Sequence, residues 1–172
     1  LVAVDGSPTS NRGLDEAMKL AGWCGAQLRL VHVVDEMSLA LAMDAYSGYV
    51  GDWLTVLRDA GKQLLEQAVA RVKAAGVEAD SCMFDSLSGS INDLILHEAD
   101  HWHAELIVLG THGRRGPRRW VLGSTAEGIV RRSPVPVLLV RALEDELAVS
   151  EQAAAKGEAA TANRRAGALT GT

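Results

Sequence analysis

A stretch rich in glycine and arginine, residues 110–124, carries the clearest chemical signal in the sequence. It reads GTHGRRGPRRWVLGS, with four glycines, four arginines and no acidic residue. Glycines let backbone N–H groups approach anionic oxygens, because no Cβ stands in the way. The stretch leads into a predicted helix that begins at Ser124 and Thr125, and the N-terminus of a helix favours a bound phosphate. These residues therefore predict a phosphate-binding loop.

The competing interpretation is a tight strand-to-helix turn in which the glycines only supply unusual φ angles. A plain turn needs fewer glycines than this, so their clustering with arginine favours the phosphate loop. Better-known phosphate motifs do not match. The chain has no G-x-x-x-x-G-K-[ST] sequence, and the turn after its first predicted strand lacks G-x-G-x-x-G. Residues 110–124 also contain no lysine that could reach a γ-phosphate.

Two further polar residues lie at or near predicted strand ends. Asp5 follows the first predicted strand, in the sequence VAVDGSPTS. There a carboxylate can contact a ligand, or it can accept local backbone N–H groups as an Asx-turn or helix cap, and both interpretations stay open. His32 lies inside the apolar run LRLVHVV. It is predicted to be a hydrogen-bonded core histidine.

A cluster of titratable residues occurs near the end of a predicted helix. Its members are His97, Glu98, Asp100, His101 and His103. Two histidines four residues apart, such as His97 and His101, share a helix face and can bind a metal ion. Because no further ligand pattern is evident, a solvated helix end is the favoured interpretation, and no metal site is predicted. No Ser-His-Asp or Cys-His arrangement can be recognised either, so no catalytic residue is predicted.

The charge balance argues against general nucleic-acid binding. The chain has 17 basic and 22 acidic side chains, which gives a formal net charge of −5. Domains that bind nucleic acids usually have a basic face. The arginines at 114, 115, 118 and 119 are accompanied by one aromatic residue that could stack on a base, Trp120.

Two features predict a cytoplasmic protein. Cys24 and Cys82 lie in apolar-looking segments and are predicted to be buried free thiols, which fits a reducing compartment. No apolar run approaches the roughly 18 residues of a membrane span. The sequence begins inside a strand-like run, so we expect residues to precede Leu1, and a targeting peptide is not needed to explain the chain.

Apolar, largely β-branched runs alternate with segments in which apolar residues recur every three or four positions. The predicted strands are 1–4, 28–34, 77–84, 106–109 and 137–140. The predicted helices are one capped by Ser7 or Thr9 and ended by Gly22 and Gly25, one from about Trp53 to Gly76, one from Ser88 or Ser90 to Trp102, and one from Ser124 to Arg132. Residues 35–52 are predicted to be a long connection, and 77–84 an edge strand. This order predicts an α/β fold with a mostly parallel sheet, helices on both faces and a ligand crevice beyond the carboxyl ends of the strands.

The chain length of 172 residues suits one domain of ordinary size. We predict that this domain spans residues 1–142. Residues 143–172 are rich in alanine and lose their apolar periodicity after Val149. They are predicted to form a C-terminal tail.

The spacing of the glycines resembles a known nucleotide motif. Gly110-x2-Gly113-x9-Gly123-Ser124 matches the G-2x-G-9x-G-[ST] pattern of the ATP-binding members of the universal stress protein family. The segments VAVDGSPTS, LVHVVDE and RRSPVPVLLVR are similar to other blocks of that family and occur in the same order. The resemblance covers about residues 1–141. The departures, Pro117 and Arg118, lie in the middle of the loop, where the family varies.

The resemblance implies a Rossmann-like, five-stranded parallel sheet in the order 3-2-1-4-5 with helices on both faces. It also implies a site for ATP, with ADP or AMP as alternatives and Mg²⁺ as an accompanying ion. By position, Asp5 would contact the ribose or adenine, the backbone of Val33 would bind adenine, and Gly110 would lie beside the ribose. The residues implied to hold the phosphates are Gly113, Gly123, Ser124 and Thr125, with His112 and Arg114 alongside.

The function that we expect is that of a cytoplasmic, ATP-binding stress-response or signalling module that acts through its nucleotide-dependent conformation or through a protein partner. Two alternatives are a slow ATP hydrolase and a nucleotide-free protein-interaction domain. We further expect a homodimer, joined through the strand at 137–140. That strand would lie at a sheet edge, and an apolar edge invites aggregation unless it is covered. A tail that folds back over the edge is the alternative cover.

Overall fold

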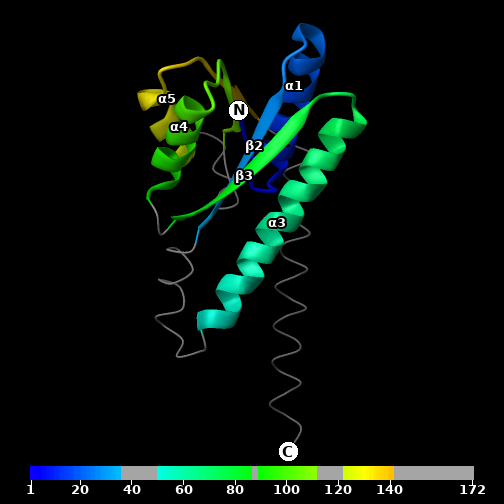
Figure 1. Cartoon of the computed structure of the whole chain (residues 1–172). Coiled ribbons are helices and arrows are strands. Elements are labelled where there is room, and N and C mark those ends of the chain that lie inside the picture. The colour runs from blue at the N-terminus through cyan, green and yellow to red at the C-terminus, as the bar shows by residue number, and fades with distance from the viewer. Residues whose placement is uncertain (36–49, 87–88, 112–121, 142–172) are drawn as a thin grey trace, which may run out of the picture. The chain divides into compact units, whose positions relative to one another are not determined.

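The fold is described from a computed structural model, in residues 1–35, 50–86, 89–111 and 122–141. The chain divides into two units, Leu1–Arg141 and Ala142–Thr172. All described residues lie in the first unit, so the tail predicted at 143–172 lies outside them. The elements, in order, are β1 (Val2–Ala3), α1 (Pro8–Cys24), β2 (Leu28–Val34), α3 (Val50–Ala74), β3 (Ala79–Asp85), α4 (Ile91–His101), β4 (Ile107–Gly110), α5 (Ser124–Arg132) and β5 (Val137–Val140) (Figure 1).

The strands form one five-stranded sheet in the order β3-β2-β1-β4-β5, and every neighbouring pair is parallel. Helices α1 and α3 pack on one face and α4 and α5 on the other, as the two hydrophobic clusters and Figure 1 show. Right-handed crossovers produce this division. The chain adds β2 and β3 on one side of β1 and then β4 and β5 on its other side, so the connecting helices change face. The predicted fold class and strand order are confirmed.

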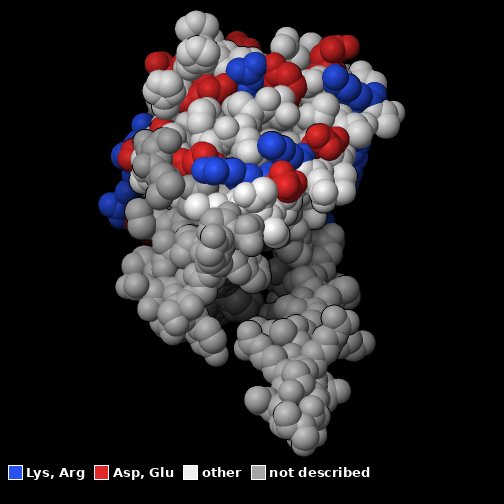
Figure 2. Space-filling model, turned by 60° about the horizontal axis from the view of Figure 1, so that its bottom comes forward, with Lys and Arg blue, Asp and Glu red and all other residues white. Residues whose placement is uncertain are grey.

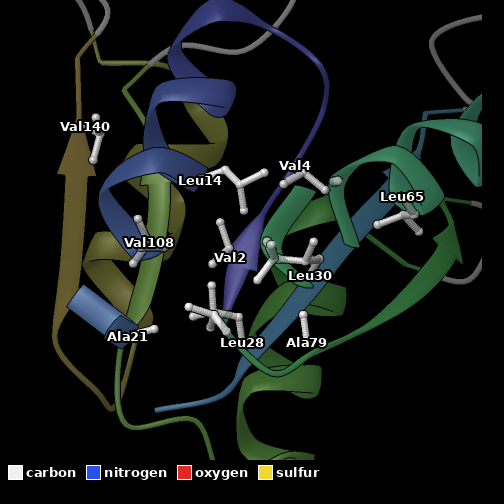
Figure 3. Packing of buried hydrophobic residues seen from close by; sticks show 14 residues of the cluster. Val2, Val4, Leu14, Ala21, Leu28, Leu30, Leu65, Ala79, Val108 and Val140 are labelled. Carbon is white, nitrogen blue, oxygen red and sulfur yellow. The ribbon is translucent and has the colours of Figure 1, made fainter. Parts of the chain in front are cut away.

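The core between the sheet and the helices α1 and α3 is built from aliphatic side chains (Figure 3). Val2 and Leu30 on the two central strands are completely buried, and Leu14 of α1 is 2% exposed. Leu65 and Val72 extend the cluster along α3. Strands covered on both faces read as continuous apolar runs, and for this reason LRLVHVV in β2 could be recognised from the sequence.

The opposite face of the sheet packs against shorter helices. Ile95 and Ala99 of α4 and Ile129 of α5 are buried against Val31 and Ile107 of the sheet. Because both faces are covered, the central strands are rigid supports for the loops at their carboxyl ends.

The caps of α1 show where sequence reasoning was right and where it was wrong. Ser7 is the N-cap and accepts a hydrogen bond from the backbone N–H of Ser10, and Pro8 occupies the first turn. Gly25 has φ +70° and ends the helix. Gly22, predicted to help end it, instead lies inside the helix, because only Gly25 adopts the left-handed conformation.

The bounds of β2, α5 and β5 are as predicted, and those of the other elements differ by one to three residues. Helix α3 begins at Val50 rather than near Trp53, since Gly51 and Asp52 obscure the apolar period there. Ser90 is the N-cap of α4, and β3 is an edge strand, as predicted. None of the helices in the described ranges is both long and apolar enough to cross a membrane.

The cysteines are less buried than predicted. Cys24 is exposed and Cys82 is half-buried, and both are free thiols. Cys24 is the last residue of α1, next to Trp23, whose side chain is 80% exposed. The segment contains apolar residues that lie on the solvent side of the helix, and its composition does not show which side they occupy.

Candidate functional site

The carboxyl ends of β1 and β4 lie together at one edge of the sheet, and the N-terminus of α1 packs directly against them. Strands β1 and β4 are hydrogen-bonded neighbours. A Cβ at Gly110, the last residue of β4, would lie 2.8 Å from the Cβ and Oγ1 atoms of Thr9 and 2.9 Å from its carbonyl carbon. Gly110 therefore has a packing reason for being glycine, in addition to the ribose contact predicted for it.

Asp5 leads from β1 into this junction. Its Oδ1 accepts the backbone N–H of Ser7 at 2.9 Å, and its own N–H donates to Ser10 Oγ at 3.0 Å. The local turn considered from the sequence is thus present, and it orients the half-buried carboxylate. Contact between Asp5 and a ligand stays a prediction.

The sequence predicted Ser7 or Thr9 as a helix cap, but it did not predict that three hydroxyl groups are buried together beside Asp5. Ser7, Thr9 and Ser10 are all buried, with exposed fractions of 3–6%. Ser7 Oγ lies 3.1 Å from Thr9 Oγ1, and Ser10 Oγ donates to the carbonyl of Ala3 at 3.4 Å. The signal was the hydroxyl-rich run SPTS after Asp-Gly, which holds the first turn of α1 against the end of β1.

The two ends of the glycine-rich loop meet through the backbone. Gly123 N–H donates to the Thr111 carbonyl at 2.9 Å, and Thr111 N–H donates to the Val140 carbonyl at 2.9 Å. Gly123 is the N-cap of α5 and makes no side-chain cap hydrogen bond. Ser124 is exposed and Thr125 half-buried in the first turn. A helix N-terminus with these donors thus lies beside the end of β4.

His112, Gly113 and Arg114 lie outside the described residues. Val33 is half-buried near the end of β2, where that strand extends past the end of β1. In the described residues, the structure therefore brings Asp5, Gly110 and Gly123 to one edge of the sheet, together with the end of β2.

One ion pair lies near this edge in the described part of the chain. Arg58 of α3 donates to Asp85, the last residue of β3, at 3.0 Å. Figure 2 shows basic and acidic side chains interspersed over the described part of the face it draws. Such mixing offers a nucleic acid no continuous basic face there.

The titratable cluster of α4 is divided by the fold. The rings of His97 and His101 stack with centroids 6.3 Å apart. Glu98 points inward, is 6% exposed, and accepts from Arg29 Nη1 at 2.7 Å. Within the described ranges, no group of three or more His, Cys, Asp or Glu side chains could hold a metal ion.

Arg29 joins three elements on that side of the sheet. It donates to Asp80 of β3 through Nε at 2.8 Å and Nη2 at 2.5 Å, and it lies 5.3 Å over the ring of Trp102. Its hydrogen bonds hold the pKa of Asp80 below the usual range. Burial, reinforced by the nearby Glu98 carboxylate, raises the pKa of the Cys82 thiol to about 12. This cluster stabilises α4 on β2 and β3, away from the loops described above.

The sequence and the fold of this chain were compared with those of known proteins. A family model described as "Universal stress protein family" matches residues 1–141. The chain belongs to the universal stress protein family. Universal stress protein YxiE of Bacillus subtilis is 31% identical over 146 residues, which span 82% of this chain and 97% of that relative.

Solved structures of universal stress proteins share the fold. One from Burkholderia pseudomallei is 29% identical, with a TM-score of 0.65 over 81% of this chain and 92% of that one. Another universal stress protein, solved in complex with cAMP, is 26% identical, with a TM-score of 0.56 over 81% of this chain and 93% of that one.

Proposed function

We propose that this universal stress protein binds ATP at the edge of the sheet formed by the carboxyl ends of β1, β2 and β4. The observation that carries the proposal is the bond between Thr111 and Gly123, which joins the two ends of the glycine-rich loop beside the N-terminus of α5. Unpaired N–H groups and the partial positive charge of a helix N-terminus favour a phosphate at that place.

The solved complex of a relative supports an adenine nucleotide as the ligand class. The universal stress protein that is 26% identical to this chain was solved with cAMP. The G-2x-G-9x-G-[ST] spacing favours ATP, with ADP and AMP as alternatives. Mg²⁺ would accompany the triphosphate, because phosphate oxygens are ligands that it prefers.

The proposed contacts are given from the adenine and ribose end of the nucleotide to its phosphates. Asp5 would bind the ribose or adenine, the Val33 backbone the base, and Gly110 would flank the ribose. The phosphates would be held by Gly113, Gly123, Ser124 and Thr125, with His112 and Arg114 alongside. Of these, Gly123 suits a close approach of phosphate, because it caps α5 without any side chain.

At the level of the whole protein, we propose a cytoplasmic stress-response module in which residues 1–142 bind nucleotide and residues 143–172 form a tail. Nucleotide would change its conformation or its affinity for a protein partner. A homodimer paired through β5 is part of this proposal. The alternatives remain a slow ATP hydrolase and a nucleotide-free interaction domain.

Calorimetric titration of the full chain with ATP and Mg²⁺ tests the site. Gly123→Val places a branched side chain in the phosphate path, so we expect the affinity for ATP to fall by at least ~10-fold, equivalent to about 1.4 kcal/mol. Gly22→Ala is the matched control, because a Cβ there meets nothing within 4 Å. Unchanged affinity in Gly123→Val would show that the site is wrongly assigned.

The same preparation separates the alternatives. A turnover of ATP at or above about 1 s⁻¹, the lower end of ordinary enzyme rates, would favour the hydrolase. No heat of binding with ATP, ADP or AMP would favour the nucleotide-free domain.

A further inference from the structure

The hydrogen-bond ladder between β1 and β2 stops at the edge where we propose that the nucleotide binds. The paired residues are Val2 with Leu30 and Ala3 with Val31, and Val4 N–H donates to the Val31 carbonyl at 2.8 Å. In a parallel ladder the next bond would run from Val33 N–H to the Val4 carbonyl. The pairing of β1 with β2 ends at Ala3 and Val31, so this next bond is not formed, although β2 continues to Val34.

The Val4 carbonyl is instead hydrogen-bonded to the side chain of His32. Its Nδ1 lies 2.7 Å from the Val4 oxygen. A carbonyl can only accept, so Nδ1 carries the hydrogen and donates. The ring is 5% exposed and lies against α3, where a Cβ on Gly61 would be 2.9 Å from Cδ2 and 3.2 Å from Nε2. The helix backbone thus holds the ring in place.

The backbone of Val33 points past the end of β1. Successive residues of a strand direct their N–H and C=O groups to opposite neighbours. Leu28 N–H donates to Glu78, just before β3, whereas the Val31 carbonyl accepts from Val4. Val33, two residues beyond Val31, therefore faces the β1 side, at the level of Asp5. Adenine offers a ring-nitrogen acceptor beside an amino donor, which matches a backbone N–H and C=O.

We propose that His32 is a positioning residue for adenine recognition. By holding the Val4 carbonyl, it keeps the ladder from closing onto Val33 N–H and leaves that group to the base. The same bond fixes the backbone just before Asp5. This inference rests on the proposed nucleotide site, but its effect on Val33 exists without any ligand.

Two variants of the full chain separate this role from simple core packing. His32→Asn keeps a side-chain N–H close to the position of Nδ1, whereas His32→Leu keeps an apolar bulk and removes the donor. In the nucleotide-free protein, we expect His32→Leu to let Val33 N–H pair with Val4. Amide hydrogen exchange at Val33, followed by NMR, should then slow by ~10-fold or more relative to wild type, while His32→Asn should exchange like wild type.

The second measurement is the preference for ATP over GTP, taken from calorimetric affinities for both. His32→Leu should lower this preference by ~10-fold, the effect of losing one base contact, and His32→Asn should retain it. Affinity for inorganic tripolyphosphate should be the same in all three proteins, because the phosphate end is untouched.

Gly61→Ala provides the test if His32→Leu does not fold, since the added Cβ would displace the ring without removing it. Gly61→Ala should shift Val33 exchange and the ATP preference in the same direction as His32→Leu. Equal Val33 exchange in wild type and in the donor-lacking or displaced variants would overturn the proposal. A wild type that binds no nucleotide would instead overturn the proposed function, while the exchange data would still decide what His32 does to Val33.

Discussion

Glu98 illustrates how one buried charge determines the chemistry of its neighbours. Its carboxylate, together with that of Asp80, accepts hydrogen bonds from Arg29, and it adds to the burial that raises the pKa of the Cys82 thiol. Breaking a buried ion pair leaves an uncompensated charge, so this carboxylate and its arginine depend on each other. Burial, reinforced by the Glu98 carboxylate, keeps Cys82 as a thiol, whereas Cys24 is open to solvent.

The two cysteines are therefore expected to react at different rates. Because its pKa is raised to about 12, the Cys82 thiol stays protonated at pH 8, and its side chain is half-buried. Under iodoacetamide, Cys24 should be alkylated first and Cys82 should be modified slowly. Mass spectrometry of the two peptides against time measures both rates.

The variant Glu98→Gln tests whether the Glu98 carboxylate contributes to the slow alkylation of Cys82. Removing the negative charge lowers the pKa of Cys82, so its alkylation should accelerate, while the rate at Cys24 serves as the internal control. Equal rates at Cys24 and Cys82 in the wild type would contradict the burial of Cys82, and an unchanged Cys82 rate in Glu98→Gln would remove Glu98 from the explanation.

At the scale of the element, α1 shows how position decides what a glycine does. Gly22 and Gly25 both have open space where a Cβ would lie, but only Gly25 has a positive φ, +70°. Inside a helix, glycine costs conformational entropy; at its C-terminal end, glycine avoids the strain of the left-handed conformation. The two residues lie one helical turn apart and have opposite energetic roles.

Alanine substitutions should therefore have effects of opposite sign. Gly22→Ala should raise the free energy of unfolding by about 0.5–1 kcal/mol. Gly25→Ala should lower it by about 1 kcal/mol because of backbone strain. Urea denaturation of both variants measures the difference, and a stabilising Gly25→Ala would contradict the left-handed cap.

At the scale of the molecule, β5 is an edge strand of the sheet among the described elements. Pro136 and Val140 direct their carbonyls to β4. Because residues alternate, Leu138 also faces β4, and the backbone groups of Val137 and Leu139 face away from the sheet. Val137, Leu138 and Leu139 are only partly buried. An apolar edge with outward N–H groups is suited to pairing with a second copy.

We expect the full chain to be a dimer by light scattering and Leu139→Pro to be a monomer. Proline removes the outward N–H of Leu139 without removing a bond to β4, and edge strands tolerate proline at such positions. Leu138→Pro is the matched control, since it removes an N–H that faces β4 and should reduce stability instead. A wild-type monomer would refute pairing through β5. A dimeric Leu139→Pro would place the interface elsewhere.

The order of elements, the regions that hold the helix caps and the two-sided sheet could be predicted from the sequence. These features depend on residues close in the chain: apolar runs such as LRLVHVV, the cap at Ser7 and the left-handed residue at Gly25. Hydrophobic period and turn chemistry act over a few residues, and the handedness of crossovers then limits how the strands can assemble. The glycine spacing from 110 to 123 is likewise a local pattern, and it indicated the family.

Only the tertiary structure decided which distant groups meet. His32 bonds to Val4, Glu98 to Arg29, and Thr9 fills the space beside Gly110. These pairs are separated by 28, 69 and about 100 residues, so no local pattern encodes them. The exposure of Cys24 likewise follows from which side of α1 the sheet covers. The register of the strands and the packing of the helices determine such contacts. Close packing of the core and pairing of its buried polar groups are achieved only in the complete fold.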